Sequence, residues 1–114
     1  LHAAPGGQGY NADISDYDPS KPSLWESIYN QRKTVDLWKR IAQRYKDEEW
    51  IAGYDLINEP NWDIPEGKLL RDLYGEITDA IRAEGDNHIL FIEGIIFIIA
   101  NKYTPINAVN SDKL

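Results

Sequence analysis

The chain has 114 residues, enough for one domain with a modest core, and its 42% hydrophobic and 27% charged residues are ordinary for a globular protein. Its net charge of −7 argues against binding to nucleic acid or to an anionic membrane, because both need a cationic surface. The chain has no cysteine, and the two histidines, His2 and His88, match no metal-ligand spacing. We therefore predict no disulfide bond, no metal ion and no cofactor.

The first part of the chain is predicted to be a long loop. Residues 5–22 contain glycine, proline, serine, asparagine and aspartate without an apolar period. Loops of this length inside compact domains are usually functional or disordered. The opening Leu1 and His2 are interpreted as the end of a preceding strand. The chain starts without the charged and apolar stretches of a signal peptide, which neither indicates nor excludes secretion.

A first helix is expected after this loop. Ser23 and Glu26 have the spacing of a capping box, in which each side chain satisfies a free backbone N–H at a helix start. Apolar residues then recur at helical spacing opposite a face of lysine, arginine and glutamine, which predicts an amphipathic helix that ends near Lys46. The apolar positions are Leu37, Trp38, Ile41, Ala42 and Tyr45. This apolar side is expected to lie on a sheet.

Two short apolar segments predict parallel strands. Residues 50–58 (WIAGYDLIN) and 88–93 (HILFIE) suit strands that are buried on both faces. Between them, apolar residues at helical spacing from Leu70 to Ile81 predict a second amphipathic helix, which Gly85 ends. The order helix, strand, helix, strand predicts an α/β protein with parallel strands and covering helices, in a single unit that spans residues 1–114.

The apolar region at residues 89–100 does not indicate a membrane helix. It is interrupted by Glu93 and Gly94 and is shorter than the roughly 20 residues that span a bilayer. Its second half, residues 95–100 (IIFIIA), has high β propensity and no charge, so it favours strand pairing or aggregation when exposed. We predict no membrane partner for the chain.

Reactive side chains fall at the predicted strand ends. Ligands of parallel α/β proteins bind at the carboxyl ends of the strands, and His2, Asn58-Glu59 and Glu93 all fall at such ends. A single histidine near a terminus, or a single glutamate before a proline, is more often just a solvated residue. The conjunction of these residues, with Trp62 directly beyond them, favours a functional site.

Several segments resemble the retaining β-glycanases of glycoside hydrolase family 5, chiefly its cellulases. They are LHAAPGGQ, SLWES with the NQRKTVDLWKRIAQRYKDE block, IAGYDLINEPN, LRDLYGEITDAIR and NHILFIEG. The family fold is a (β/α)₈ TIM barrel, and the elements expected here are similar to the end of its third strand through its fifth strand. The resemblance implies that Glu59 is the general acid/base, that Asn58 hydrogen-bonds near the sugar 2-OH, and that His2 is an active-site histidine.

The chemistry of glycoside cleavage agrees with these roles. A glycosidic oxygen is a poor leaving group, so a protonated carboxyl in a fixed position, here Glu59, must donate a proton to it. Asn58 can donate a hydrogen bond to a sugar hydroxyl, a contact that strengthens in the transition state. Trp62 can offer a flat face to a pyranose ring, although packing beneath the loop is an equally good interpretation of this residue.

The resemblance also implies what the chain does not contain. Retention needs a second carboxylate about 5–5.5 Å from the first. The family places this nucleophile near its seventh strand, whereas Glu93 matches the fifth, so we interpret Glu93 as a lining or structural residue. Because a full barrel takes about 250 residues, we interpret the chain as a fragment that is inactive in isolation. Residues 95–114 match the family poorly.

The resulting hypothesis is a fragment of a secreted glycoside hydrolase, extracellular or periplasmic, that cleaves β-1,4-glucan of the cellulose type with retention. Its expected partners are a β-glucan polysaccharide and either the missing remainder of the barrel or another copy of the chain. Two alternatives stay open. One is a non-catalytic carbohydrate-binding remnant that uses Trp25 and Trp62, and the other is a structural α/β fragment that binds nothing.

Overall fold

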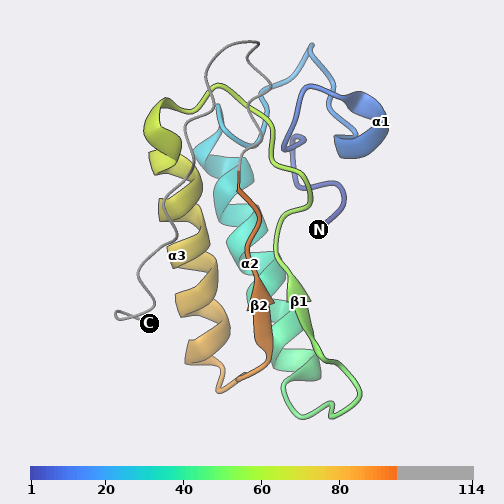
Figure 1. Ribbon diagram of the computed structural model, residues 1–114, viewed down its shortest axis with the longest axis vertical. Coiled ribbons are helices and arrows are strands. Elements are labelled where there is room, and N and C mark those ends of the chain that lie inside the picture. Colours follow the sequence, from blue (N-terminus) through green and yellow to red (C-terminus); the bar gives the residue numbers. More distant parts are fainter. Residues whose placement is uncertain (95–114) are drawn as a thin grey trace.

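The computed structural model describes residues 1–94 and shows an α/β chain (Figure 1). The elements in chain order are α1 (Ala12–Ser15), α2 (Ile28–Tyr45), β1 (Gly53–Asp55), the 3-10 helix η1 (Pro65–Gly67), α3 (Lys68–Ala83) and β2 (Ile89–Phe91). The expected order of helix, strand, helix and strand is therefore confirmed. The predictions for the run at residues 95–100 and for residues 95–114 lie outside the described residues.

The two strands form a parallel sheet, in which Tyr54 lies opposite Leu90 and α3 supplies the crossover. Leu1 lies beside the continuation of β1. Its amine donates to the carbonyl oxygen of Leu56 (3.0 Å), and its own carbonyl accepts the N–H of Asn58 (2.9 Å). This alternation is the hydrogen-bond pattern of parallel strands. The first residues therefore lie along the sheet, as expected for the end of a strand.

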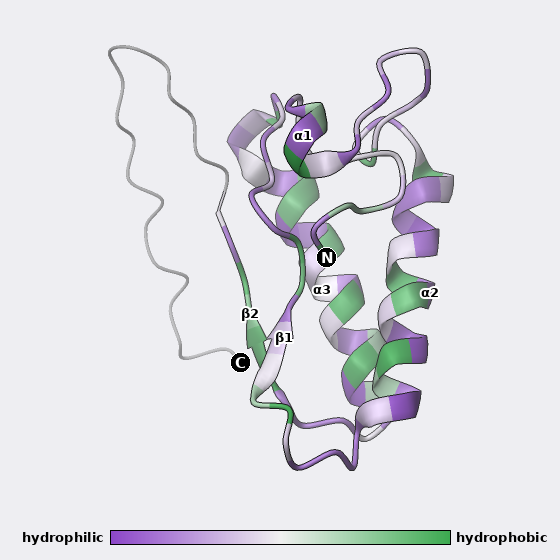
Figure 2. Ribbon diagram, turned by 90° about the vertical axis from the view of Figure 1, so that its right-hand side faces the viewer, coloured by the Kyte–Doolittle hydropathy of each residue, from purple (hydrophilic) through white to green (hydrophobic). Residues whose placement is uncertain are grey.

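Helices α2 and α3 cover the same face of the sheet (Figure 2). Trp38 of α2 is buried and donates its indole N–H to the carbonyl oxygen of Leu56 at 3.2 Å. Ile77 and Ile81 of α3 are fully buried, and each such side chain contributes about 1.5–3 kcal/mol relative to an exposed one. The prediction of two amphipathic helices that pack on a sheet is confirmed, but two of the five apolar positions predicted for the first helix, Leu37 and Tyr45, are exposed at 37% each.

The other face of the sheet is exposed, contrary to the expectation that both strands are buried on both faces. Ile89 is 60% exposed, Phe91 is 52% exposed and Ile92 is 55% exposed. Only the inward side of β2, at Leu90, packs against the core. The reason is architectural, because both long helices lie on one side and no element of residues 1–94 covers the second side (Figure 2).

The predicted element boundaries need two corrections. The capping box forms, with the backbone N–H of Ser23 donating to the Glu26 carboxylate at 3.0 Å, but it closes a turn. Helix α2 starts only at Ile28, where the Ser27 hydroxyl accepts the Asn30 N–H. Strand β1 is shorter than residues 50–58, because the Ile51 N–H donates to Glu48 within a turn. No helix of residues 1–94 combines the length and apolarity needed to span a bilayer.

A buried polar cluster lies at the amino ends of the strands. Asp86 is fully buried and accepts hydrogen bonds from the Tyr54 hydroxyl (2.7 Å) and the His88 backbone N–H (2.9 Å). The His88 ring lies between the Asp86 carboxylate, 2.7 Å from Nδ1, and the Glu48 carbonyl oxygen, 3.0 Å from Nε2. Both partners are acceptors, so this arrangement favours the doubly protonated form of the ring.

The electrostatics of this cluster follow from its hydrogen bonds. The Glu48 carbonyl and the Asp86 carboxylate raise the pKa of His88 above its ordinary value. Burial acts to raise the pKa of Asp86, but the hydrogen bonds from His88 and Tyr54 outweigh it and lower that pKa. The Tyr54 hydroxyl therefore ties the loop before β2 to β1, and the pair of Asp86 and His88 lies within that loop.

Candidate active site

A buried glutamine joins the segments that meet at the carboxyl ends of the strands. Gln8 is fully buried in the loop after His2. Its Nε2 donates to the carbonyl oxygens of His2 (2.8 Å) and Asn58 (2.9 Å), and its Oε1 accepts the N–H of Ala4 (3.0 Å). One side-chain amide therefore places two of the predicted site residues next to each other.

The backbone of Gln8 extends this connection past Glu59. Its carbonyl oxygen accepts the N–H of Asn61 (3.0 Å) and the indole N–H of Trp25 (2.9 Å). Gly9 and Asn61 form a parallel bridge next to it. The long first loop, which includes α1, is therefore bound to the segment that carries Glu59 on both sides of that residue (Figure 1).

Glu59 lies exposed at the turn after β1 in a backbone conformation that glutamate rarely adopts. Its φ is 44°, in the left-handed region. Its N–H donates to Oε2 of Glu93, which follows β2, at 2.8 Å. Among residues 1–94, the Glu59 carboxylate has no hydrogen-bond partner. The backbone of this residue is therefore held in place while its side chain remains available to a ligand.

Tyr74 of α3 supports the same region from the helical side. Its hydroxyl lies 3.0 Å from the carbonyl oxygen of Glu93 and 3.5 Å from that of Ile57. Burial raises the pKa of Tyr74 above its ordinary value, so the hydroxyl remains protonated and donates. The ends of β1 and β2 are therefore joined through a residue of the crossover helix.

The structure places the predicted site residues as follows. His2 and Glu59 are exposed, and Asn58 and Glu93 are half-buried. Gln8 brings the backbones of His2 and Asn58 together, and the Glu59 backbone N–H donates to the Glu93 side chain. The predicted roles of His2, Asn58 and Glu59 in binding and catalysis remain predictions.

Trp62 is only 9% exposed, which agrees with the interpretation that this side chain packs beneath the loop. Tyr10 stacks on its indole, with ring centroids 4.1 Å apart and an angle of 12° between the planes. Tyr17 meets the same indole edge-on at 5.2 Å. Of these three aromatic side chains, Tyr10 is the most exposed, at 54%. Tyr10 therefore offers an exposed ring, with Trp62 packed against its other face, while Trp62 also lines the adjacent cleft and its predicted binding role stays a prediction.

The sequence analysis missed both Gln8 and Tyr10. Gln8 has no reactive group, and its importance depends on partners such as Asn58, which lies 50 positions away in the sequence. Tyr10 lies in a loop without an apolar period, so no spacing distinguishes it from the other tyrosines. The available signal was position, since both residues follow His2 in the loop expected after a strand end.

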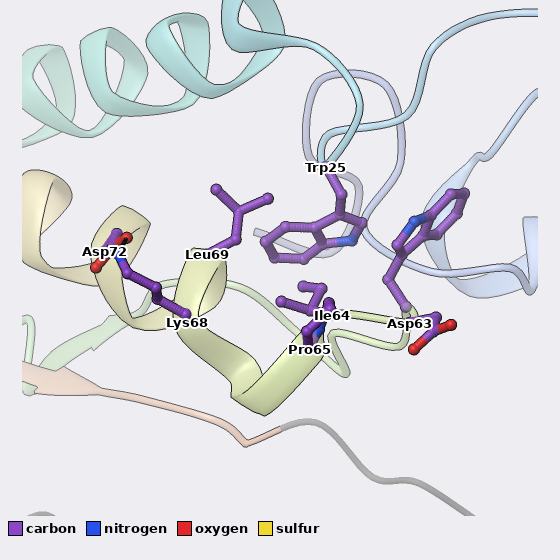
Figure 3. A pocket seen from close by; sticks show the side chains of 8 residues that line it. Trp25, Asp63, Ile64, Pro65, Lys68, Leu69 and Asp72 are labelled. Carbon is purple, nitrogen blue, oxygen red and sulfur yellow. Dashed lines mark hydrogen bonds and ion pairs between the residues drawn. The ribbon is translucent and has the colours of Figure 1, made fainter.

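A cleft of about 400 Å³ lies next to this aromatic group. Figure 3 shows Trp25 pointing toward Ile64 and Pro65 across the cleft. Its lining is mostly apolar with charged side chains at Asp63, Lys68 and Asp72. Among residues 1–94, no group of three or more histidine, aspartate or glutamate side chains is arranged to hold a metal ion.

Comparison with known families identifies the class of protein. The model of the family described as Cellulase (glycosyl hydrolase family 5) matches residues 9–111, which is most of the chain. The chain therefore belongs to glycosyl hydrolase family 5, and the resemblance noted from its sequence is confirmed. Its class is that of the glycoside hydrolases.

Individual relatives carry different glycosidase names. The chain is similar to a beta-xylosidase of Phanerodontia chrysosporium (40% identity over 98 residues, 85% of this chain and 20% of the relative). It is also similar to an endoglycoceramidase of Cyanea nozakii (36% over 90 residues, 64% and 18%) and a probable glucan 1,3-beta-glucosidase A of Aspergillus clavatus (28% over 86 residues, 73% and 20%). The chain spans about a fifth of the length of these relatives. No solved structure matches it.

Proposed function

We propose that this chain supplies the acid/base half of a retaining β-glycosidase site, as part of a (β/α)₈ barrel from the end of the third strand through the fifth strand. The observation that carries the proposal is Glu59, whose backbone is fixed at the end of β1 while its carboxylate is exposed. Membership of glycosyl hydrolase family 5 supports it. The parallel order of Leu1, β1 and β2 is the order that such a barrel requires.

In the proposed reaction, the Glu59 carboxyl donates a proton to the glycosidic oxygen as the bond to the sugar breaks. Asn58 donates a hydrogen bond to the sugar 2-OH, and His2 lines the same end of the sheet. A second carboxylate about 5–5.5 Å from Glu59 attacks the sugar and makes the mechanism retaining. We assign that role to a residue outside this chain, because the family resemblance places the nucleophile near the seventh strand, whereas Glu93 matches the end of the fifth.

We propose a β-1,4-glucan of the cellulose type as the substrate, in keeping with the name of the family model. The names of the relatives justify testing xyloside, glycosylceramide and β-1,3-glucan substrates beside it. Tyr10 is the proposed stacking surface for a sugar ring, because its exposed ring is held rigid by Trp62 at 4.1 Å. Secretion of the whole protein is part of the same proposal.

The proposal is tested in a complete barrel. Residues 1–94 of this chain replace the matching segment of the Phanerodontia chrysosporium beta-xylosidase, to which the chain is 40% identical. Glu59→Gln in this chimera should reduce kcat on an unactivated glycoside by about 10²–10⁴-fold, because the amide cannot deliver a proton. The kcat on a glycoside with an activated leaving group, such as a dinitrophenyl glycoside, should fall much less.

The matched control is Glu76→Gln, which makes the same chemical change at an exposed position on α3. It should leave both rates unchanged. If Glu59→Gln behaves like Glu76→Gln on the unactivated glycoside, the acid/base assignment is wrong.

A non-catalytic carbohydrate-binding protein is the second candidate, and the exposed ring of Tyr10 favours it. Trp25 and Trp62 are both largely buried but both line the cleft, so the version of this candidate that relies on these two tryptophans places the ligand in that cleft. Saturable binding of cello-oligosaccharide by the 114-residue chain, lost in Tyr10→Ala and without turnover in the chimera, would favour this candidate over the enzyme.

A further inference from the structure

We propose that Gln8 and Glu93 are positioning residues for Glu59, an inference that rests on the proposed acid/base role of Glu59. They hold the turn that carries Glu59 from two sides. Gln8 reaches it from the long first loop and Glu93 from the end of β2. Both contacts are made to backbone atoms of this turn. They therefore fix the position from which the Glu59 side chain extends and leave its carboxyl group free.

Gln8 is buried, and both ends of its side-chain amide are hydrogen-bonded. Its amide nitrogen bonds two carbonyl oxygens, its amide oxygen accepts one N–H, and its backbone carbonyl accepts two further donors. The bonds to Asn58 and Asn61 fall on either side of Glu59. A buried glutamine whose side-chain amide is paired at both its nitrogen and its oxygen has one favoured orientation, because another orientation leaves buried groups without partners.

The Glu93 side acts on Glu59 directly. Its Oε2 accepts the Glu59 N–H at 2.8 Å, and its backbone carbonyl is held by the Tyr74 hydroxyl at 3.0 Å. A carboxylate acceptor makes a stronger hydrogen bond than a neutral acceptor does. This matters because Glu59 has a φ of 44°, a conformation that persists only when the surrounding structure enforces it.

The consequence for catalysis is geometric. Proton transfer needs the acid within hydrogen-bond reach of the glycosidic oxygen, and a misplacement of about 1 Å costs about 10²-fold in rate. Loss of either contact should let the turn relax and move the carboxyl. The loss of kcat should be large for an unactivated glycoside, whose leaving group needs a proton, and small for an activated glycoside, whose leaving group departs without one.

The first experiment compares two glutamines in the chimera. Gln8→Met should reduce kcat on an unactivated glycoside by about 10²-fold, with much less loss on the dinitrophenyl glycoside. Gln31→Met is the matched control, because Gln31 is also buried and donates to two carbonyl oxygens, those of Leu24 and Trp25. If the two variants change the ratio of the two rates equally, Gln8 is a structural residue and the proposal fails.

The second experiment compares two substitutions of Glu93. Glu93→Gln keeps an acceptor for the Glu59 N–H and should restore most of the activity that Glu93→Ala loses on the unactivated glycoside. In the 114-residue chain itself, hydrogen exchange measured by NMR should show the Glu59 N–H protected in the parent and in Glu93→Gln, and unprotected in Glu93→Ala. This pair decides the proposal if Gln8→Met does not fold.

The two proposals fail in different ways. If Glu59→Gln does not change the dependence on the leaving group, the acid/base function is wrong. If Glu59→Gln does change it but Glu93→Ala and Glu93→Gln behave alike, the acid/base function stands and the positioning role is wrong.

Discussion

Replacing Asp86 by alanine should destabilise the chain strongly, although Asp86 lies far from the site along the strands. Asp86 is fully buried and accepts three hydrogen bonds, from the Tyr54 hydroxyl, the His88 backbone N–H and the His88 ring. Asp86→Ala leaves these donors without their acceptor and leaves the His88 ring without its acidic partner. Removing one partner of such a buried pair costs about 3–5 kcal/mol.

The control is Asp72→Ala, which removes the acid of an exposed ion pair with Lys68 on α3. Exposed pairs contribute about 0–1 kcal/mol, so this variant should barely change the free energy of unfolding. Asp86→Asn keeps one acceptor oxygen and should fall between the two. The free energies of unfolding of these three variants together separate the effect of the buried hydrogen bonds of Asp86 from the effect of its charge.

The assay is urea unfolding of the 114-residue chain, with all variants at one protein concentration because association changes apparent stability. A shift of the midpoint in Asp86→Ala, without a change in slope, would measure the lost stability directly. If Asp86→Ala costs no more than Asp72→Ala, the polar cluster does not hold the loop before β2 to β1.

Three further predictions concern pH, the second carboxylate and association. The pKa of His88 in the folded chain is raised above its unfolded value of about 6.5. The stabilisation from protonated His88 is therefore fully present below about pH 6.5 and is lost as the pH rises through the raised pKa. Melting temperatures measured across this pH range should show the loss in the parent and not in His88→Gln. A mechanism-based fluoroglycoside should leave no covalent sugar on Glu93 in the chimera, and a mass-spectrometric adduct there would make Glu93 the nucleophile. The isolated chain should hydrolyse no β-glucan and should self-associate through the exposed face at Ile89 and Phe91. Phe91→Lys should favour the monomer in sedimentation, because burying an unpaired ammonium costs several kcal/mol. A parent chain that is monomeric at every concentration would contradict the association.

The helices and the strand order were predictable because they depend on local apolar spacing. The pattern from Leu70 to Ile81 places one side of a helix on a core, and α3 runs from Lys68 to Ala83. The start of α2 was not predictable from the capping box, since Ser23 and Glu26 make the same reciprocal bonds in an isolated turn. The exposed face of β2 was missed because an apolar run does not show what covers it.

The site was predictable in part for the same reason. Asn58 and Glu59 follow an apolar strand and precede a proline, which is a local signal. The roles of Gln8 and Tyr10 come from contacts with residues about 50 positions away, which a single sequence does not reveal. Trp62 attracted attention as a large aromatic residue beside the acid, yet a tryptophan has the most area to bury and here it forms the support beneath Tyr10.

The structure gives a physical reason for the glutamate in the turn after β1. The N–H of Asn58 pairs with Leu1, its carbonyl pairs with Gln8, and the N–H of Glu59 pairs with Glu93. Pro60 has no N–H to satisfy. Other residues therefore supply the partners that a turn at the end of a strand needs, and the Glu59 side chain is not required for any of them. A side chain that the fold does not use, on a backbone that the fold holds in a rare conformation, is what an acid that must meet a substrate requires.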